Sequence, residues 1–329
     1  MRTLALACLT AVAAIKCWHA ADCVAQQAPG PATLENLLDS PDRAPLKLPA
    51  KDPDAPFPPV VPDEAAVEAA KGLIRQAYED DYRTVEKNPE PLIQKLLAAA
   101  RQTKDPTRRY AFLLSAEQAA VTGGDYDRTM ELIDIRSTEF AIDGIQTRIE
   151  RLAEFLTPKA KTSPEILAGL YQCAIETTER ALKQESFEQA AAAAEMATTS
   201  AKALLMAGKA KKNETVAHDG ETKQADARSL AKEVERRAGL FTEYQRAVEA
   251  IKAKDDPAAN DVIGSYLCLE VGDWQKGLPF LAKSDQKEIA DAAAEELKVL
   301  ASGKQGAKAV FDLAGKWWSA SESEGIKES

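Results

Sequence analysis

The sequence predicts an all-α protein in which consecutive helices pair as antiparallel hairpins. From Asp63 onward, residue combinations that start helices recur almost without interruption. Between these starts, apolar residues return at the three- and four-residue steps of one helix face, and we find no convincing strand-like alternation. Hydrophobic residues make up 45% of the 329 residues, which is enough to build a sizeable core.

Residues 1–25 are typical of an export signal. Arg2 supplies a basic start, and the apolar run at residues 4–15 is shorter than the roughly 20 helical residues that span a bilayer. Cleavage is expected after Ala25, while earlier cleavage, an uncleaved anchor and acylation of a cysteine stay open. The sequence therefore predicts a protein exported to the periplasm or the cell surface.

Residues 26–62 are predicted to form a Pro-rich, disordered spacer. Ten of the seventeen prolines lie within residues 29–62. Because proline lacks the N–H donor that helices and sheets require, this segment is expected to be extended. Its interpretation as a spacer competes with that of a terminal tail without a role.

Residues 63–254 are predicted to form a helical array. The last long helix, at about 222–254, carries a coiled-coil-like seam that we expect to pack inside the array rather than form a zipper. That seam comprises Leu230, Val234, Phe241, Tyr244, Val248 and Ile251. The earlier helices are expected to start at Pro62-Asp63, Asn88-Pro-Glu-Pro, Asp105-Pro-Thr, Asp125, about Ile142, Thr162-Ser163-Pro164-Glu165 and about residue 186.

A pattern of a small residue, Gly-Asp and an aromatic residue recurs along the chain. Ala116-x7-Gly124-Asp125-Tyr126-x2-Thr129 matches Gly264-x7-Gly272-Asp273-Trp274-x2-Gly277, and a fainter copy spans residues 177–190. The small residue permits close helix approach, Gly-Asp ends one helix and caps the next, and the aromatic side chain fills the gap. This is the logic of tetratricopeptide repeats, although the spacing differs by one residue and no fixed period appears. Residues 255–329 are therefore predicted to form a tetratricopeptide-like C-terminal module.

The stretch from Asp256 to Asp285, followed by Trp317-Trp318, resembles a family of uncharacterised, exported helical proteins of planctomycete bacteria. This resemblance covers most of the chain after the spacer and implies a helical fold, but it brings neither an activity nor catalytic residues. Leu269 departs from the family pattern, where an aromatic residue is usual, as does Gly315-Lys316. The matching residues are Asn260, Gly264, Tyr266, Leu267, Cys268, Gly272, Asp273, Trp274, Gly277, Leu278, Pro279, Leu281 and Ala282.

The charge balance and the supply of reactive residues narrow the possible functions. The chain has 42 Lys+Arg against 52 Asp+Glu, and this acidic balance argues against binding nucleic acid or anionic lipid. After removal of residues 1–25, His218 is the one remaining histidine, and we expect it in a solvated loop. A Ser-His-Asp or zinc site is therefore not expected, and neither is a phosphate-binding loop or any other cofactor site. Paired carboxylates cannot be singled out.

Two cysteines, Cys173 and Cys268, follow the predicted signal, and both lie in apolar helical patterns. A disulfide between them is permitted in an oxidising compartment. We favour buried free thiols that act as small apolar side chains.

Three tryptophans remain after the predicted signal, all within the last 56 residues. They are expected either to pack the terminal helices or to line a groove for a partner, and packing is favoured. Since neighbours on a helix point about 100° apart, one of Trp317 and Trp318 is the better candidate for exposure. The candidate interaction or structural motif comprises Gly272, Asp273, Trp274, Gly277, Leu278, Pro279, Trp317 and Trp318.

These observations favour a non-enzymatic helical scaffold in the cell envelope that offers a concave face to another protein or peptide. One alternative is a polysaccharide hydrolase or lyase, which would need two carboxylates and an aromatic platform in one cleft. The other is a structural envelope component, which self-association without another partner would favour. The sequence predicts no membrane insertion of the mature chain and leaves the partner and the oligomeric state open.

Overall fold

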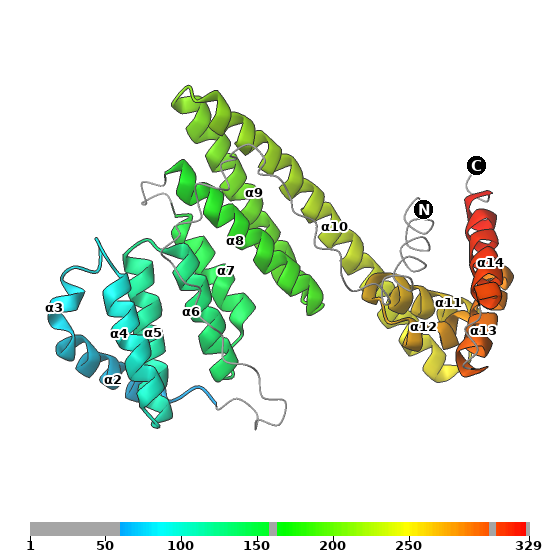
Figure 1. Cartoon of the computed structure of the whole chain (residues 1–329), viewed down its shortest axis with the longest axis horizontal. Helices are drawn as coiled ribbons and strands as arrows, with labels where there is room; N and C mark the ends of the chain where they lie inside the picture. The colour runs from blue at the N-terminus through cyan, green and yellow to red at the C-terminus, as the bar shows by residue number, and fades with distance from the viewer. Residues whose placement is uncertain (1–59, 158–162, 303–306, 327–329) are drawn as a thin grey trace. The chain divides into compact units, whose positions relative to one another are not determined.

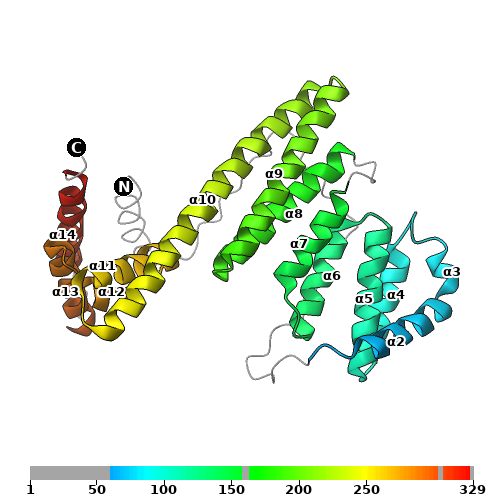
Figure 2. The same ribbon diagram turned by 180° about the vertical axis from the view of Figure 1, so that it is seen from behind.

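The computed structural model describes residues 60–157, 163–302 and 307–326 (Figures 1 and 2). These residues form thirteen α-helices and one π-helical segment, with no strand among them, so the prediction of an all-α fold is confirmed. The predicted signal at residues 1–25 lies outside the described residues. Apart from residues 60–62, so does the predicted spacer.

The chain divides into two compact units, and the boundary falls within α10 (Glu214–Ala253). The described part of the first unit lies within residues 60–235 and that of the second within residues 236–326. The first unit also contains α2 (Glu64–Ala77), α3 (Glu79–Tyr82), α4 (Glu90–Gln102), α5 (Pro106–Thr122), α6 (Tyr126–Glu139), α7 (Gly144–Phe155), α8 (Pro164–Lys183) and α9 (Phe187–Ala210). The second contains α11 (Pro257–Ser265), the π-helix η2 (Tyr266–Val271), α12 (Trp274–Leu281), α13 (Lys287–Ser302) and α14 (Ala307–Ile326).

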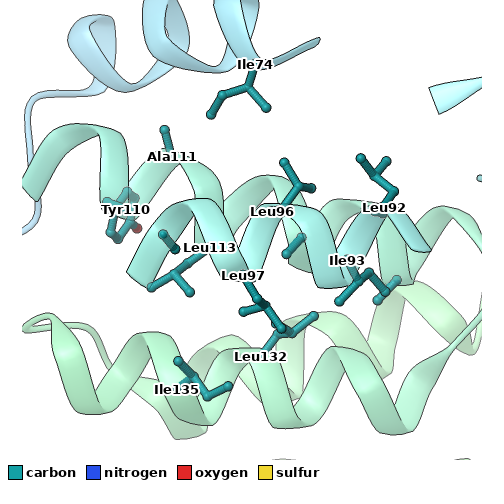
Figure 3. Close-up of a cluster of buried hydrophobic side chains, with 14 of the residues drawn as sticks. Ile74, Leu92, Ile93, Leu96, Leu97, Tyr110, Ala111, Leu113, Leu132 and Ile135 are labelled. Carbon is teal, nitrogen blue, oxygen red and sulfur yellow. The ribbon is translucent and has the colours of Figure 1, made fainter. Parts of the chain in front are cut away.

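Consecutive helices of the first unit pack side by side. Helices α8 and α9 lie together in both views and are joined by a turn at residues 184–186, so they run antiparallel (Figures 1 and 2). Helix α5 contacts both α4 and α6. In Figure 3 the predicted apolar stripe of α4 lies between side chains of α2, α5 and α6. Its members Leu92, Ile93, Leu96 and Leu97 are all buried.

Most of the helix starts lie where the sequence predicts them. Asp63, Asp105, Asp125 and Ser163 each accept a hydrogen bond from a first-turn N–H group. The prediction that Asn88 helps to cap α4 is wrong. The N–H of Asn88 bonds the carbonyl of Thr84, so Asn88 belongs to the preceding turn, and α4 starts after Pro89 without a side-chain cap.

Helix α10 starts earlier than the predicted residue 222, which corrects the expected position of His218. The side chain of Asn213 caps α10 through the N–H of Val216, and His218 is an exposed residue within the helix rather than in a loop. The polar sequence that suggested a loop is the solvent face of this helix. Gly220, in contrast, is buried and faces α9, where an added Cβ atom would overlap the backbone of Leu205.

The predicted seam of α10 packs within the chain. In the first unit, Val234 lies in an apolar cluster with alanines of α9. In the second unit, Tyr244 and Ile251 pack against Ile263 of α11. None of the helices in the described part of the chain combines the length and apolar character needed to cross a membrane.

Candidate functional site

The candidate motif begins at the turn between η2 and α12. Gly272 adopts the left-handed conformation, with φ 78° and ψ 10°, which glycine tolerates best. The Oδ1 of Asp273 accepts the N–H of Lys276 at 3.1 Å, and its Oδ2 lies 2.7 Å from Lys276 Nζ. Hydrogen bonds from Lys276 hold the pKa of Asp273 below its ordinary value. Gly272 thus ends one helix and Asp273 caps the next, as the repeat pattern predicts.

The same turn closes three earlier helix pairs, with one difference. The N–H groups of Asp125, Ser186 and Asn213 each reach back five residues to a carbonyl at 2.9 Å. The N–H of Asp273 reaches back six residues, to Leu267 at 2.8 Å. The extra residue is taken up by the π-helix η2, and π-helical turns are frequent at functional sites.

Close contact between η2 and α12 explains the second glycine of the motif. A Cβ atom added to Gly277 would overlap the Sγ of Cys268, so only glycine lets the two helices approach this closely. Leu278 next to it is fully buried. Pro279 is exposed and has no N–H to donate to the carbonyl of Gln275, and α12 ends two residues later, at Leu281.

Trp274 and Trp317 pack against each other in the apolar cluster of the second unit. Their rings meet edge to face, with centroids 5.8 Å apart and an interplanar angle of 85°. The Nε1 of Trp317 donates a hydrogen bond to Glu296 Oε2 at 2.7 Å. Burial raises the pKa of Glu296, whereas this hydrogen bond lowers it. These contacts connect α12, α13 and α14.

Trp318 points in a different direction from Trp317 and is 48% exposed. Phe311, seven residues earlier on α14, is 79% exposed. A separation of seven residues places two side chains on the same side of a helix. Because Trp317 and Ala320 pack toward α13, helix α14 carries one apolar face directed inward and a second directed to solvent.

An aromatic cluster lies where α10 meets η2. The rings of Tyr244 and Tyr266 stack with centroids 4.5 Å apart, and Phe241 lies about as far from each, at 6.1 and 5.9 Å. The neighbouring carboxylate of Glu270 receives both Nη groups of Arg236 at 2.8 Å. Tyr266 is buried and the other two rings are half-buried, and the carboxylate of Glu270 is already engaged in an ion pair.

The two cysteines agree with the favoured interpretation, because both are buried free thiols. Burial, reinforced by the charges of Glu296 and Asp273, raises the pKa of Cys268 to about 12. Burial also raises the pKa of Cys173, which lies in the first unit. Such thiols stay protonated at neutral pH and are poor nucleophiles. In the part of the chain that the structure describes, no three His, Cys, Asp or Glu side chains gather as a metal site.

No protein-family model, no curated protein and no solved structure matches the chain. The structure brings Gly272, Asp273, Trp274, Gly277 and Trp317 together in the second unit. Trp318 and Pro279 lie at its surface. Sequence reasoning missed Phe311, although its spacing of seven residues from Trp318 was a usable signal.

Proposed function

We propose that the protein is a non-enzymatic helical scaffold that binds another protein through the solvent-facing apolar side of α14. The observation that carries this proposal is the joint exposure of Phe311 and Trp318. Two large aromatic side chains on one helix face are costly to hydrate, and such clusters mark interaction sites. Tryptophan in particular is enriched among the residues that dominate binding energy.

Other residues of the motif pack behind this face and hold α14 in position. Trp274 and Trp317 pack edge to face, and Glu296 receives the Trp317 indole, so α14 is held by both α12 and α13. The contact of Gly277 with Cys268 holds α12 against η2 in turn. We assign these residues to positioning the helix and assign no reaction to the chain.

The finer features of the proposal rest on the sequence. The repeated Gly-Asp-aromatic pattern supports a tetratricopeptide-like array, and its turns share one hydrogen-bond geometry in three of four cases. Residues 1–25 support export to the periplasm or cell surface. The scaffold is therefore proposed to act in the cell envelope, as the resemblance to exported planctomycete proteins also implies.

A crosslinking pull-down from an envelope fraction tests the proposal. The wild-type chain should recover a protein that Phe311→Ala and Trp318→Ala lose, while both variants keep the circular dichroism spectrum of a folded helical protein. Leu73→Ala is the matched control, because Leu73 is an exposed apolar residue on α2. It should recover the same protein as wild type. Equal recovery by all variants, or no recovery by wild type, would count against this surface as the binding face.

A further inference from the structure

The turn between α9 and α10 carries a tripeptide with the acceptor pattern for an N-linked sugar chain. Asn213 is followed by Glu214 and Thr215, so an asparagine stands two positions before a hydroxyl-bearing residue, with no proline between them. No other asparagine of the sequence has this pattern.

This turn is open to solvent. Residues 209–215 are all exposed. Figures 1 and 2 both show the turn at the tip where α9 and α10 meet. Because a sugar chain is bulky and hydrophilic, it is tolerated only where it can stay outside the packed core. The position of the tripeptide meets this condition.

The helix cap leaves the side-chain nitrogen of Asn213 available for modification. The Oδ1 of Asn213 accepts the N–H of Val216 at 3.2 Å, and the backbone N–H of Asn213 donates to the carbonyl of Gly208 at 2.9 Å. Its Nδ2 has no hydrogen-bond partner among the described residues. N-linked attachment uses Nδ2 and keeps the carbonyl oxygen, so the modification and the cap are compatible.

The hydroxyl of Thr215 is available because of its place in the helix. Threonines further into their helices, such as Thr129 and Thr177, donate their hydroxyl to the carbonyl four residues earlier, at 2.7 Å in both. Thr215 lies in the first turn of α10, where no helical carbonyl lies behind it, and its hydroxyl has no partner among the residues that the structure describes. Capping therefore accounts for Asn213 but not for the threonine two positions later.

We propose that Asn213 is the attachment site of an N-linked sugar chain. The donor is an oligosaccharide whose anomeric carbon is joined to a lipid diphosphate. The Nδ2 of Asn213 forms a bond to that carbon and gives up one proton to a base of the transferase. The bond from the carbon to the diphosphate oxygen breaks, and the lipid diphosphate leaves with the bonding electrons. The hydroxyl of Thr215 is the group that marks this asparagine for the transferase.

The inference rests on the expected export of the chain and not on the binding face of α14. Sugar chains of this kind are attached to secreted proteins. Residues 1–25, which have the pattern of an export signal, would bring the chain to the transferase.

Mass spectrometry of the full chain, purified from the envelope fraction of the cells that make it, tests the proposal. The peptide that contains Asn213 should carry the mass of a sugar chain. An amidase that releases N-linked sugars should remove that mass and leave an aspartate at this position. Thr215→Ala should lose the sugar chain, whereas Thr215→Ser keeps the hydroxyl and should stay modified.

Thr222→Ala is the matched control. Thr222 is an exposed threonine of the same helix that follows no asparagine, and its hydroxyl donates to the carbonyl of His218. This variant should stay modified. All three variants keep the Asn213 cap of α10, so their circular dichroism spectra should match that of the wild type.

An unmodified Asn213 in the wild type, or absence of the chain from the envelope fraction, overturns the proposal. A sugar that persists in Thr215→Ala also overturns it, because the sugar is then attached elsewhere, for example by non-enzymatic reaction with the exposed Lys211 or Lys212. A chain that is modified at Asn213 but captures no protein through α14 would support this inference and count against the proposed function. The converse result would do the opposite.

Discussion

The guanidinium of Arg136 contacts a single carboxylate oxygen of Glu117, through Nε at 3.0 Å and Nη2 at 2.7 Å. Glu117 is completely buried and Arg136 nearly so. The second oxygen of Glu117 accepts Nε of Arg151 at 2.9 Å. One carboxylate on α5 is thereby bound from both α6 and α7. No buried side-chain nitrogen or oxygen in the described residues lacks a hydrogen-bond partner.

Replacing Glu117 by Gln should lower the free energy of unfolding by about 3–5 kcal/mol, because it leaves the charge of Arg136 buried without its counter-ion. Urea unfolding followed by circular dichroism measures this change. Glu249→Gln is the matched control. It breaks the ion pair with Lys252, which is largely exposed, and should cost at most about 0.5 kcal/mol. Similar decreases in the free energy of unfolding of the two variants would show that the buried ion pair stabilises the fold no more than the exposed one.

The four helix-ending turns differ in the residue that takes the left-handed conformation. Gly124 and Gly272 do so as glycines, whereas Glu185 and Lys212 do so with side chains, at φ 55° and 52°. A side chain in this conformation costs about 1–2 kcal/mol, while glycine loses about 0.5–1 kcal/mol of chain entropy. Glu185→Gly and Lys212→Gly should therefore each raise the free energy of unfolding by about 0.5–1 kcal/mol.

The reverse substitution, glycine to alanine at position 272, should change the free energy of unfolding in the opposite direction. Gly272→Ala should lower the free energy of unfolding by about 0.5–1 kcal/mol, since the strain of a left-handed side chain exceeds the chain entropy that alanine saves. Gly239→Ala should instead raise it by up to about 1 kcal/mol, because Gly239 lies inside α10 with open space around its Cα. If both alanine variants shift stability in the same direction, backbone conformation is not the cause.

The contact between Gly277 and Cys268 can be tested with a double-mutant cycle. Gly277→Ala should cost about 1–3 kcal/mol, because the new methyl group overlaps the Cys268 sulfur. In a Cys268→Ala background the same change should cost at least about 0.5 kcal/mol less, because the sulfur is gone. Thermal and urea unfolding of the four proteins give the coupling energy. Additive costs would contradict a direct overlap.

The sequence was a good guide to the local structure of this protein. An Asp or Ser before an apolar stripe marks a helix start because the cap bond forms within three residues, as at Asp105 and Ser163. The turn at Gly272 and Asp273 is equally local. The prediction of a cap at Asn88 failed because this residue could belong either to the start of α4 or to the turn before it, and its N–H bonds the carbonyl of Thr84 in that turn.

Burial of charge and exposure of apolar residues depend on distant parts of the chain. Arg128 is nearly fully buried because Glu90, 38 positions away, accepts two of its hydrogen bonds. A sequence pattern gives no sign of such a partner, so the burial of this arginine could not be predicted from the sequence. Phe311 is the opposite case, an apolar side chain that is exposed. Its helix already packs one apolar side against α13, and Phe311 lies on a second apolar side.

The half-buried carboxylate of Glu296 leads to a prediction about pH. Burial raises its pKa above 4.5, so the folded chain binds this proton more tightly than the unfolded chain does. The stabilisation is present below pH 4.5 and is lost as the pH rises through the folded pKa. Cys268 stays protonated throughout this range, with its pKa at about 12, and adds no slope.

Urea unfolding of the wild type and Glu296→Gln, measured over a pH series that starts below 4.5, isolates this carboxylate from the others. The stability of the wild type relative to Glu296→Gln should fall as the pH rises, since only the wild type loses a proton at this position. Trp317→Phe removes the indole N–H that lowers the pKa of Glu296, so the fall should move to higher pH. A pH-independent difference would mean that Glu296 titrates equally in the folded and unfolded chains. That outcome would contradict its burial between α13 and α14.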